Sequence, residues 1–191
     1  MESFSELHSN RKISFKRMVN YFGKFIFIFI KIFFNKKKIV LFSSYSLNVY
    51  SDNPKYLFEY LSKNTEIETY WLTDNLEIQE YLSSNNLKFV GIKNIPLLIW
   101  VMLKTKVSVN AGIQYFNIFG ILDNNSTIKI STLHGSGPKA TISRTENIKT
   151  AINQIKNINK FNYINFSSEF SLTNIGKRVY LIPNSKIINF G

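Results

Sequence analysis

A short polar segment that follows an apolar run carries the residues best suited to chemistry. After the apolar run 128–133 the chain reads His134, Gly135, Ser136, Gly137, Pro138 and Lys139. His134 could act as a base toward a substrate hydroxyl. The two glycines would let backbone N–H groups approach an anion, and Lys139 and Arg144 would add positive charge beside it. The plain alternative is a loop histidine without a chemical role, because one motif is only a hypothesis.

A second segment with binding potential reads Ser51, Asp52, Asn53, Pro54 and Lys55. Proline is favoured in the first turn of a helix, and Asp52 or Asn53 could cap the backbone N–H groups that open it. The segment therefore predicts a helix start that could also bind a substrate. Capping alone is the alternative role.

Short apolar runs alternate with amphipathic segments after residue 38, and these elements must position the two segments. We expect strands at 39–42, 68–73, 87–90, 107–110, 128–133, 163–166 and 186–190, and helices at 55–63, 76–84, 95–104, 146–160 and 168–178. This alternation predicts an α/β fold with a Rossmann-like, mostly parallel sheet and helices on both faces. Right-handed crossovers gather the carboxyl ends of the strands at one edge, so both segments are expected near one cleft.

The first 38 residues differ in character from the rest. We expect a flexible tail over 1–10 and a basic amphipathic helix over 11–38. The apolar run 21–34 would reach only about 21 Å as a helix, short of a hydrocarbon core of roughly 30 Å. On a helical wheel one polar stripe holds Arg17, Asn20, Lys24, Lys31 and Asn35. This pattern predicts a helix in the interface of an anionic membrane, with a helix packed on a partner domain or a strand as alternatives.

Composition limits the classes of function. The chain has 191 residues, which suits one α/β domain, and carries a net charge of +12, which favours an anionic partner unless it reflects a drift toward Lys, Asn and Ile. There is no cysteine, and there are only two histidines, so a thiolate or histidine-rich metal site is excluded. Nucleic acid is disfavoured as a partner because the aromatic residues lie in apolar core runs.

Several segments together resemble the CDP-glycerol glycerophosphotransferase family, the teichoic-acid primases and polymerases. The matching pieces are 42–45, 51–55, 70–72, 133–139, 165–170 and 182–188, continuing to Gly191. Their order and spacing agree from residue 39 to residue 191. The Ser-Asp-Asn-Pro-Lys piece and the His-Gly-x-x-x-Lys piece are the most specific of them.

The resemblance implies the N-terminal, acceptor-side domain, at 39–191, of a two-domain GT-B-type enzyme that is peripheral to the cytoplasmic face of the cell membrane. Such enzymes transfer glycerol phosphate, or a related polyol phosphate, from CDP-glycerol to a lipid-linked glycan acceptor in teichoic-acid or cell-surface polymer synthesis. His134 stands where the family has its catalytic histidine, which the resemblance implies to act as a base or to hold the phosphate. The residues implied to bind substrate are Ser51, Asp52, Asn53, Lys55, Gly135, Ser136, Gly137 and Lys139. No metal and no cofactor beyond the donor substrate is implied.

Two features depart from the family. Leu133 stands where members often have tryptophan, and the chain ends at Gly191, where members usually continue with a second, donor-binding domain. We therefore expect the 191-residue chain to be inactive alone. The alternative is a catalytically inactive accessory or remnant domain that binds a phosphorylated lipid-linked glycan at the membrane.

Overall fold

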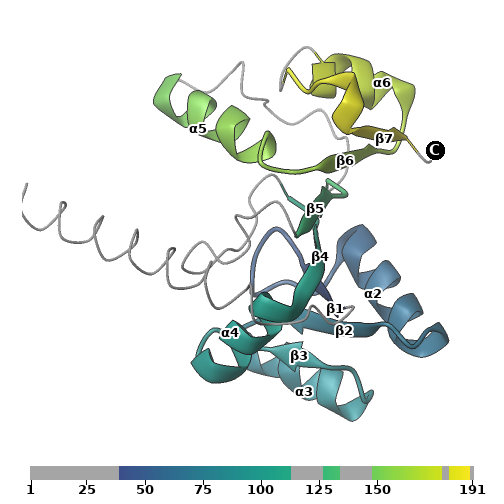
Figure 1. Cartoon of the computed structure of the whole chain (residues 1–191), viewed down its shortest axis with the longest axis vertical. Coiled ribbons are helices and arrows are strands. Elements are labelled where there is room, and N and C mark those ends of the chain that lie inside the picture. The colour runs from purple at the N-terminus through teal and green to yellow at the C-terminus, as the bar shows by residue number, and fades with distance from the viewer. Residues whose placement is uncertain (1–38, 113–126, 134–147, 178–180, 190–191) are drawn as a thin grey trace, which may run out of the picture.

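The structure is a computed structural model that describes residues 39–112, 127–133, 148–177 and 181–189 (Figure 1). The strands are β1 Ile39–Ser43, β2 Glu68–Leu72, β3 Phe89–Val90, β4 Thr105–Asn110, β5 Ile128–Ser131, β6 Tyr163–Phe166 and β7 Ile187–Asn189. The helices are α2 Asp52–Asn64, α3 Leu76–Ser84, α4 Ile95–Lys104, α5 Ile148–Ile158 and α6 Glu169–Ser171, with a π-helix at Leu172–Lys177 and a 3-10 turn at Asn184–Lys186. The predicted α/β alternation is confirmed.

The seven strands form one sheet in the order β3-β2-β1-β4-β5-β6-β7, and every pair is parallel. The order reverses direction between β1 and β4, which makes that junction the topological switch point of the sheet. Ser43 is level with Asn110, and Asn110 is level with Ser131. The carboxyl ends of β1, β4 and β5 therefore lie side by side.

Capping side chains set the starts of two helices where the sequence predicted them. Asn75 accepts bonds from the backbone N–H groups of Glu77 and Ile78 at 2.9 and 3.3 Å, and Asn94 accepts one from Leu97 at 3.3 Å. Each bond satisfies an N–H that the first turn of a helix leaves unpaired. As a result, α3 and α4 have the predicted bounds, Leu76–Ser84 and Ile95–Lys104.

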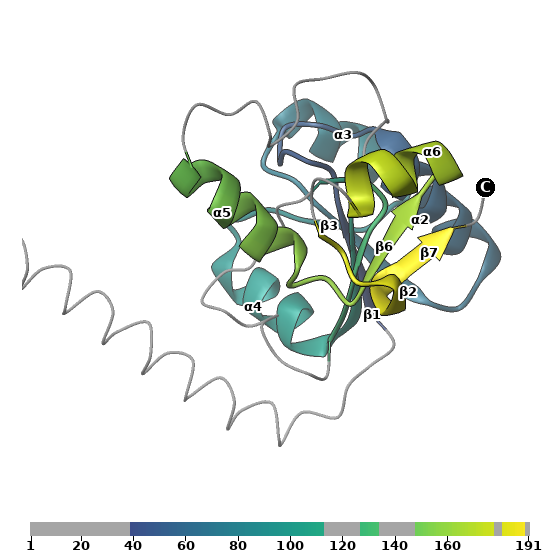
Figure 2. The same cartoon turned by 90° about the horizontal axis from the view of Figure 1, so that it is seen from above.

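Both faces of the central strands are buried under helices, as predicted. Alternation along β1 sends Val40 and Phe42 into a cluster with residues of α2 and α3, and Ile39 and Leu41 into a cluster with α4. Figure 2 shows α4 and α2 on opposite sides of β1. Each strand end is therefore held from both sides.

A third apolar cluster surrounds β6. Figure 1 shows β6 beside the edge strand β7. The cluster joins Ile158 of α5 to Ile164 and Phe166 of β6 and to Leu172 of the π-helix. This cluster thus stabilises the β6–β7 side of the sheet.

The predicted tail at 1–10 and the predicted interfacial helix at 11–38 lie outside the described residues. Of the helices that the structure does describe, none combines the length and apolarity needed to cross a bilayer.

Candidate functional site

The switch point between β1 and β4 is a candidate position for a site, because open α/β sheets bind ligands there. β1 ends at Ser43 and β4 at Asn110, and both residues are buried. These two strand ends, with the end of β5 beside them, form what we call the carboxyl-edge cluster.

Asn110 joins the two strands within this carboxyl-edge cluster. Its Nδ2 donates one hydrogen bond to Ser43 Oγ at 2.8 Å and another to the carbonyl of Ser44 at 2.9 Å, while its Oδ1 accepts one from the backbone N–H of Gly112. The side chain is 0% exposed. All polar atoms of the amide are thus paired, as burial of a polar group requires.

The end of β5 is tied to the same point. Ser131 Oγ donates to the carbonyl of Gly112 at 2.9 Å and accepts a bond from the backbone N–H of Leu133 at 3.3 Å. The backbone N–H of Thr132 donates to the carbonyl of Asn110 at 2.9 Å. β5 ends at Ser131, so the strand predicted to reach Leu133 is two residues too long, because Leu133 turns into the left-handed region at φ 51°.

The Ser51–Lys55 segment opens α2 earlier than predicted. The helix begins at Asp52, not Lys55, and Ser51 occupies the N-cap position without a side-chain bond to the helix. Ser51 Oγ instead donates to Asp52 Oδ2 at 3.2 Å, and Asp52 has a φ of 65°. The predicted capping by Asp52 or Asn53 is therefore wrong, although Asp52 adds a negative charge to the first turn, where the helix dipole favours it.

Lys55 lies against aromatic rings. Its Nζ is 5.1 Å from the ring centroid of Tyr50 and 5.8 Å from that of Tyr56, within the range of cation–π attraction. Tyr50 in turn packs edge-on against Trp71, with the ring centroids 4.7 Å apart. These contacts fix the ammonium group over the α2 face of the sheet.

The loop from β1 to α2 is held over the end of β2. Thr73 Oγ1 donates to the carbonyl of Leu47 at 2.6 Å, and the Tyr50 hydroxyl donates to Glu59 Oε1 at 2.8 Å. Burial, and next the bond to Glu59, raises the pKa of Tyr50 well above its usual range. The loop is thereby anchored at both ends.

One buried hydroxyl beside the carboxyl-edge cluster lacks a partner. Ser44 is 0% exposed, and its Oγ makes no hydrogen bond. Such a group costs free energy unless a ligand or another polar atom reaches it. Because the Ser44 side chain is also closed to solvent, its unpaired hydroxyl is a cost to stability and not a binding position.

The structure describes only part of the predicted site, and its binding and catalytic roles stay predictions. Of the predicted substrate-binding residues it describes Ser51, Asp52, Asn53 and Lys55, whereas the predicted catalytic His134 and the predicted Gly135, Ser136, Gly137 and Lys139 lie outside the described residues. Sequence reasoning missed the roles of Asn110, Ser43, Ser44 and Ser131. Their signal is a polar residue directly at the end of an apolar strand.

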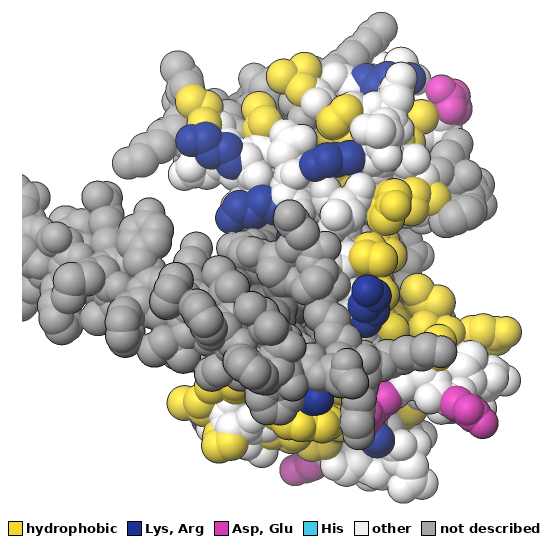
Figure 3. Space-filling view, viewed as in Figure 1, with side chains coloured by type: hydrophobic (Ala, Val, Ile, Leu, Met, Phe, Trp, Pro, Cys, Tyr) yellow, Lys and Arg dark blue, Asp and Glu magenta, His cyan; other side chains and the backbone are white. Residues whose placement is uncertain are grey.

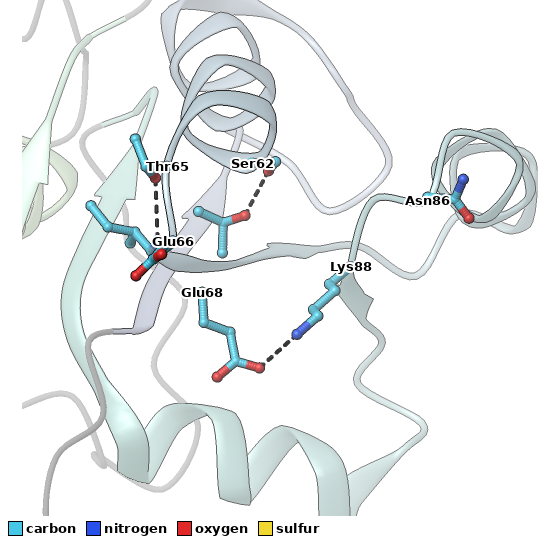
Figure 4. A pocket seen from close by; sticks show the side chains of 8 residues that line it. Ser62, Thr65, Glu66, Glu68, Asn86 and Lys88 are labelled. Carbon is cyan, nitrogen blue, oxygen red and sulfur yellow. Dashed lines mark hydrogen bonds and ion pairs between the residues drawn. The ribbon is translucent and has the colours of Figure 1, made fainter.

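A hollow at the opposite edge of the sheet does not coincide with the predicted site. It has a volume of about 430 Å³ and lies beside the start of β2 (Figure 4). Its polar contacts include an ion pair between Lys88 and Glu68 at 2.8 Å and a hydroxyl pair between Ser62 and Thr69 at 2.6 Å. In the part of the chain that the structure describes, no acidic or histidine cluster could hold a metal ion.

Comparison with known proteins gives a family and a fold. The family model described as CDP-glycerol:poly(glycerophosphate) glycerophosphotransferase matches residues 25–191. Structures of the wall teichoic acid polymerase TagF resemble the chain, one with TM-score 0.67 and 17% identity over 97% of this chain and 46% of that chain. A histidine-to-asparagine variant of TagF with CDPG gives TM-score 0.68 and 16% identity over the same shares. No curated protein sequence matches the chain. The chain thus spans about half the length of the TagF structures that it matches.

Proposed function

The chain belongs to the CDP-glycerol:poly(glycerophosphate) glycerophosphotransferase family, and we propose that it forms the N-terminal, acceptor-side domain of a membrane-associated GT-B-type enzyme. Its reaction is transfer of glycerol phosphate, or a related polyol phosphate, from CDP-glycerol to a lipid-linked acceptor in teichoic-acid or cell-surface polymer synthesis. The observation that carries this proposal is the family match over 25–191, which includes both the Ser51–Lys55 and the His134–Lys139 segments.

In this reaction an acceptor hydroxyl attacks the phosphorus that bears glycerol, the pyrophosphate bond breaks, and CMP leaves. His134 takes the proton from the attacking hydroxyl as general base. Backbone N–H groups at Gly135 and Gly137, with Lys139, hold the phosphate oxygens. Ser51, Asp52, Asn53 and Lys55 contact the acceptor.

The distribution of charge supports anionic substrates. Apart from Glu169, every acidic residue that the structure describes lies between Asp52 and Glu80, whereas nine lysines with described side chains follow, at 88, 93, 104, 106, 129, 156, 160, 177 and 186. Figure 3 shows Lys side chains on the part of the molecule that holds α5. Positive charge of this kind attracts phosphorylated ligands and anionic surfaces.

Membrane attachment is assigned to residues 11–38, as a basic amphipathic segment peripheral to the cytoplasmic face. The chain reaches β1 directly from this segment through Lys36, Lys37 and Lys38. Basic residues beside an apolar face add attraction to anionic headgroups.

The test of the catalytic role replaces His134 with alanine in an enzyme that joins this chain to a donor-binding domain. Transfer from radiolabelled CDP-glycerol should fall by ~10²-fold or more, because a general base contributes about that much. His8→Ala, the other histidine of the chain, is the matched control and should leave turnover unchanged. Unchanged turnover in His134→Ala would instead favour a non-catalytic domain that binds a phosphorylated lipid-linked glycan. We expect no transfer from the 191-residue chain alone.

A further inference from the structure

Asn110 occupies the one position where the ends of β1, β4 and β5 meet. The hydrogen bonds of its side-chain amide reach Ser43 and Ser44 on one side and Gly112 on the other. Its backbone carbonyl accepts a hydrogen bond from the N–H of Thr132. Only a carboxamide supplies two donors and an acceptor in this geometry. An aspartate would bring a charge and lose both donors, and an aliphatic side chain would lose all three bonds.

The hydrogen bonds continue from Asn110 to the residue that precedes His134. Gly112, held by Asn110 Oδ1, accepts a bond from Ser131 Oγ, and Ser131 Oγ accepts one from the backbone N–H of Leu133. Leu133 has a φ of 51°, which a leucine adopts only where its surroundings impose it. The relay therefore determines how the backbone leaves β5.

We propose that Asn110 is a positioning residue of the transferase site and that Ser131 is its relay. Asn110 fixes the carboxyl-edge cluster, and through Ser131 it sets the backbone direction at Leu133, the residue before His134. The inference rests on the proposed function of His134 and adds to it the residues that fix the backbone immediately before that segment. Neither Asn110 nor Ser131 needs to touch the substrate.

Thr105 provides a matched control for this role. It lies at the opposite end of β4, is 0% exposed like Asn110, and donates a hydrogen bond to the carbonyl of Val101 at 2.7 Å. Thr105→Val and Asn110→Ala each remove buried hydrogen bonding from the same strand. A role limited to the overall stability of the sheet would lower the thermal midpoint in both variants and leave the His134 signal unchanged in both.

The experiment follows the imidazole signals of the 191-residue chain by NMR, which is simple because His8 and His134 are the only two histidines. A His8→Gln variant assigns the signals. Asn110→Ala should shift the His134 signal and its titration midpoint, whereas Thr105→Val should leave both unchanged while also lowering the thermal midpoint. Ser131→Ala should move the His134 signal in the same direction as Asn110→Ala. It provides the test of the relay if Asn110→Ala does not fold.

An unmoved His134 signal in Asn110→Ala and Ser131→Ala, or an equal shift in Thr105→Val, would overturn the proposal. In the transfer assay, Asn110→Ala should lower kcat about ten-fold or more, since misplacement of a catalytic group is costly. The NMR result does not depend on activity. If His134 is not the base, Asn110→Ala should still shift the His134 signal. If Asn110 and Ser131 do not position His134, His134→Ala should still lose transfer activity.

Discussion

Ser43 and Ser44 are neighbours in the sequence with opposite hydrogen-bonding states. Ser43 Oγ accepts from Asn110, whereas Ser44 Oγ is buried without a partner. Ser43→Ala should lower the free energy of unfolding by about 1–2 kcal/mol, because it leaves a buried donor unpaired. Ser44→Ala should leave it unchanged or raise it, because it removes an unsatisfied group. Urea unfolding of both variants measures the difference. An equal loss in Ser44→Ala would mean that its hydroxyl has a partner.

The phenol of Tyr70 makes the free energy of unfolding depend on pH in alkaline solution. Burial, and next Glu68, raises the pKa of Tyr70 to about 12, above the value near 10 of an unfolded chain. The folded state therefore holds the phenol proton more tightly. This contribution to stability is complete below pH ~10 and is lost as the pH rises through about 12.

Unfolding free energies at several values between pH 9 and pH 12 measure this effect. Tyr70→Phe should flatten the fall over that range, and Tyr50→Phe should do so as well, because the pKa of Tyr50 is also raised. Tyr56→Phe, which removes an exposed phenol, controls for the loss of a tyrosine. The same slope in Tyr70→Phe and in the unchanged chain would contradict the assignment.

At the scale of elements, agreement between sequence and structure follows the range of the deciding interactions. α3 and α4 have the predicted bounds because Asn75 and Asn94 cap them locally. β4 begins at Thr105, two residues before the predicted start, because Thr105 is level with Ile39 across the sheet. The end of β5 was also misjudged, because bonds to Gly112 and Asn110 decide it. No pattern within one element contains those partners.

Gly176 in the π-helix Leu172–Lys177 is required by its contact with β6. A Cβ at this position would lie 2.6 Å from Cζ of Phe166, whose ring is buried and cannot move aside. Gly176→Ala should therefore destabilise the fold by about 1–3 kcal/mol, the usual cost of overpacking. Thermal unfolding measures it. In a Phe166→Leu background the same substitution should cost less, and an equal cost in both backgrounds would exclude the contact as the cause.

At the scale of the molecule, the sequence predicted the parallel sheet and the edge at which its strand ends gather. It did not identify Asn110 as the residue joining three of those ends, since the level register of Ser43, Asn110 and Ser131 exists only in the assembled sheet. The predicted proximity of Ser51–Lys55 to His134 remains a prediction. The part carrying Asp52 to Glu80 is acidic and the part from Lys88 onward is basic, which a single net charge conceals.

The basic segment 11–38 and the acidic part between Asp52 and Glu80 together predict which residues of the chain bind a membrane. The 191-residue chain should sediment with vesicles of phosphatidylglycerol and not with vesicles of phosphatidylcholine, and salt should weaken the binding. Replacing Lys24 and Lys31 with glutamine should weaken it about 30-fold, since each basic residue near the surface contributes roughly 1 kcal/mol. Lys55 and Lys63, which lie on the acidic part, are the matched pair and should have little effect. Equal losses of vesicle binding in the two pairs of variants would mean that the net charge of the chain, and not residues 11–38, causes the binding.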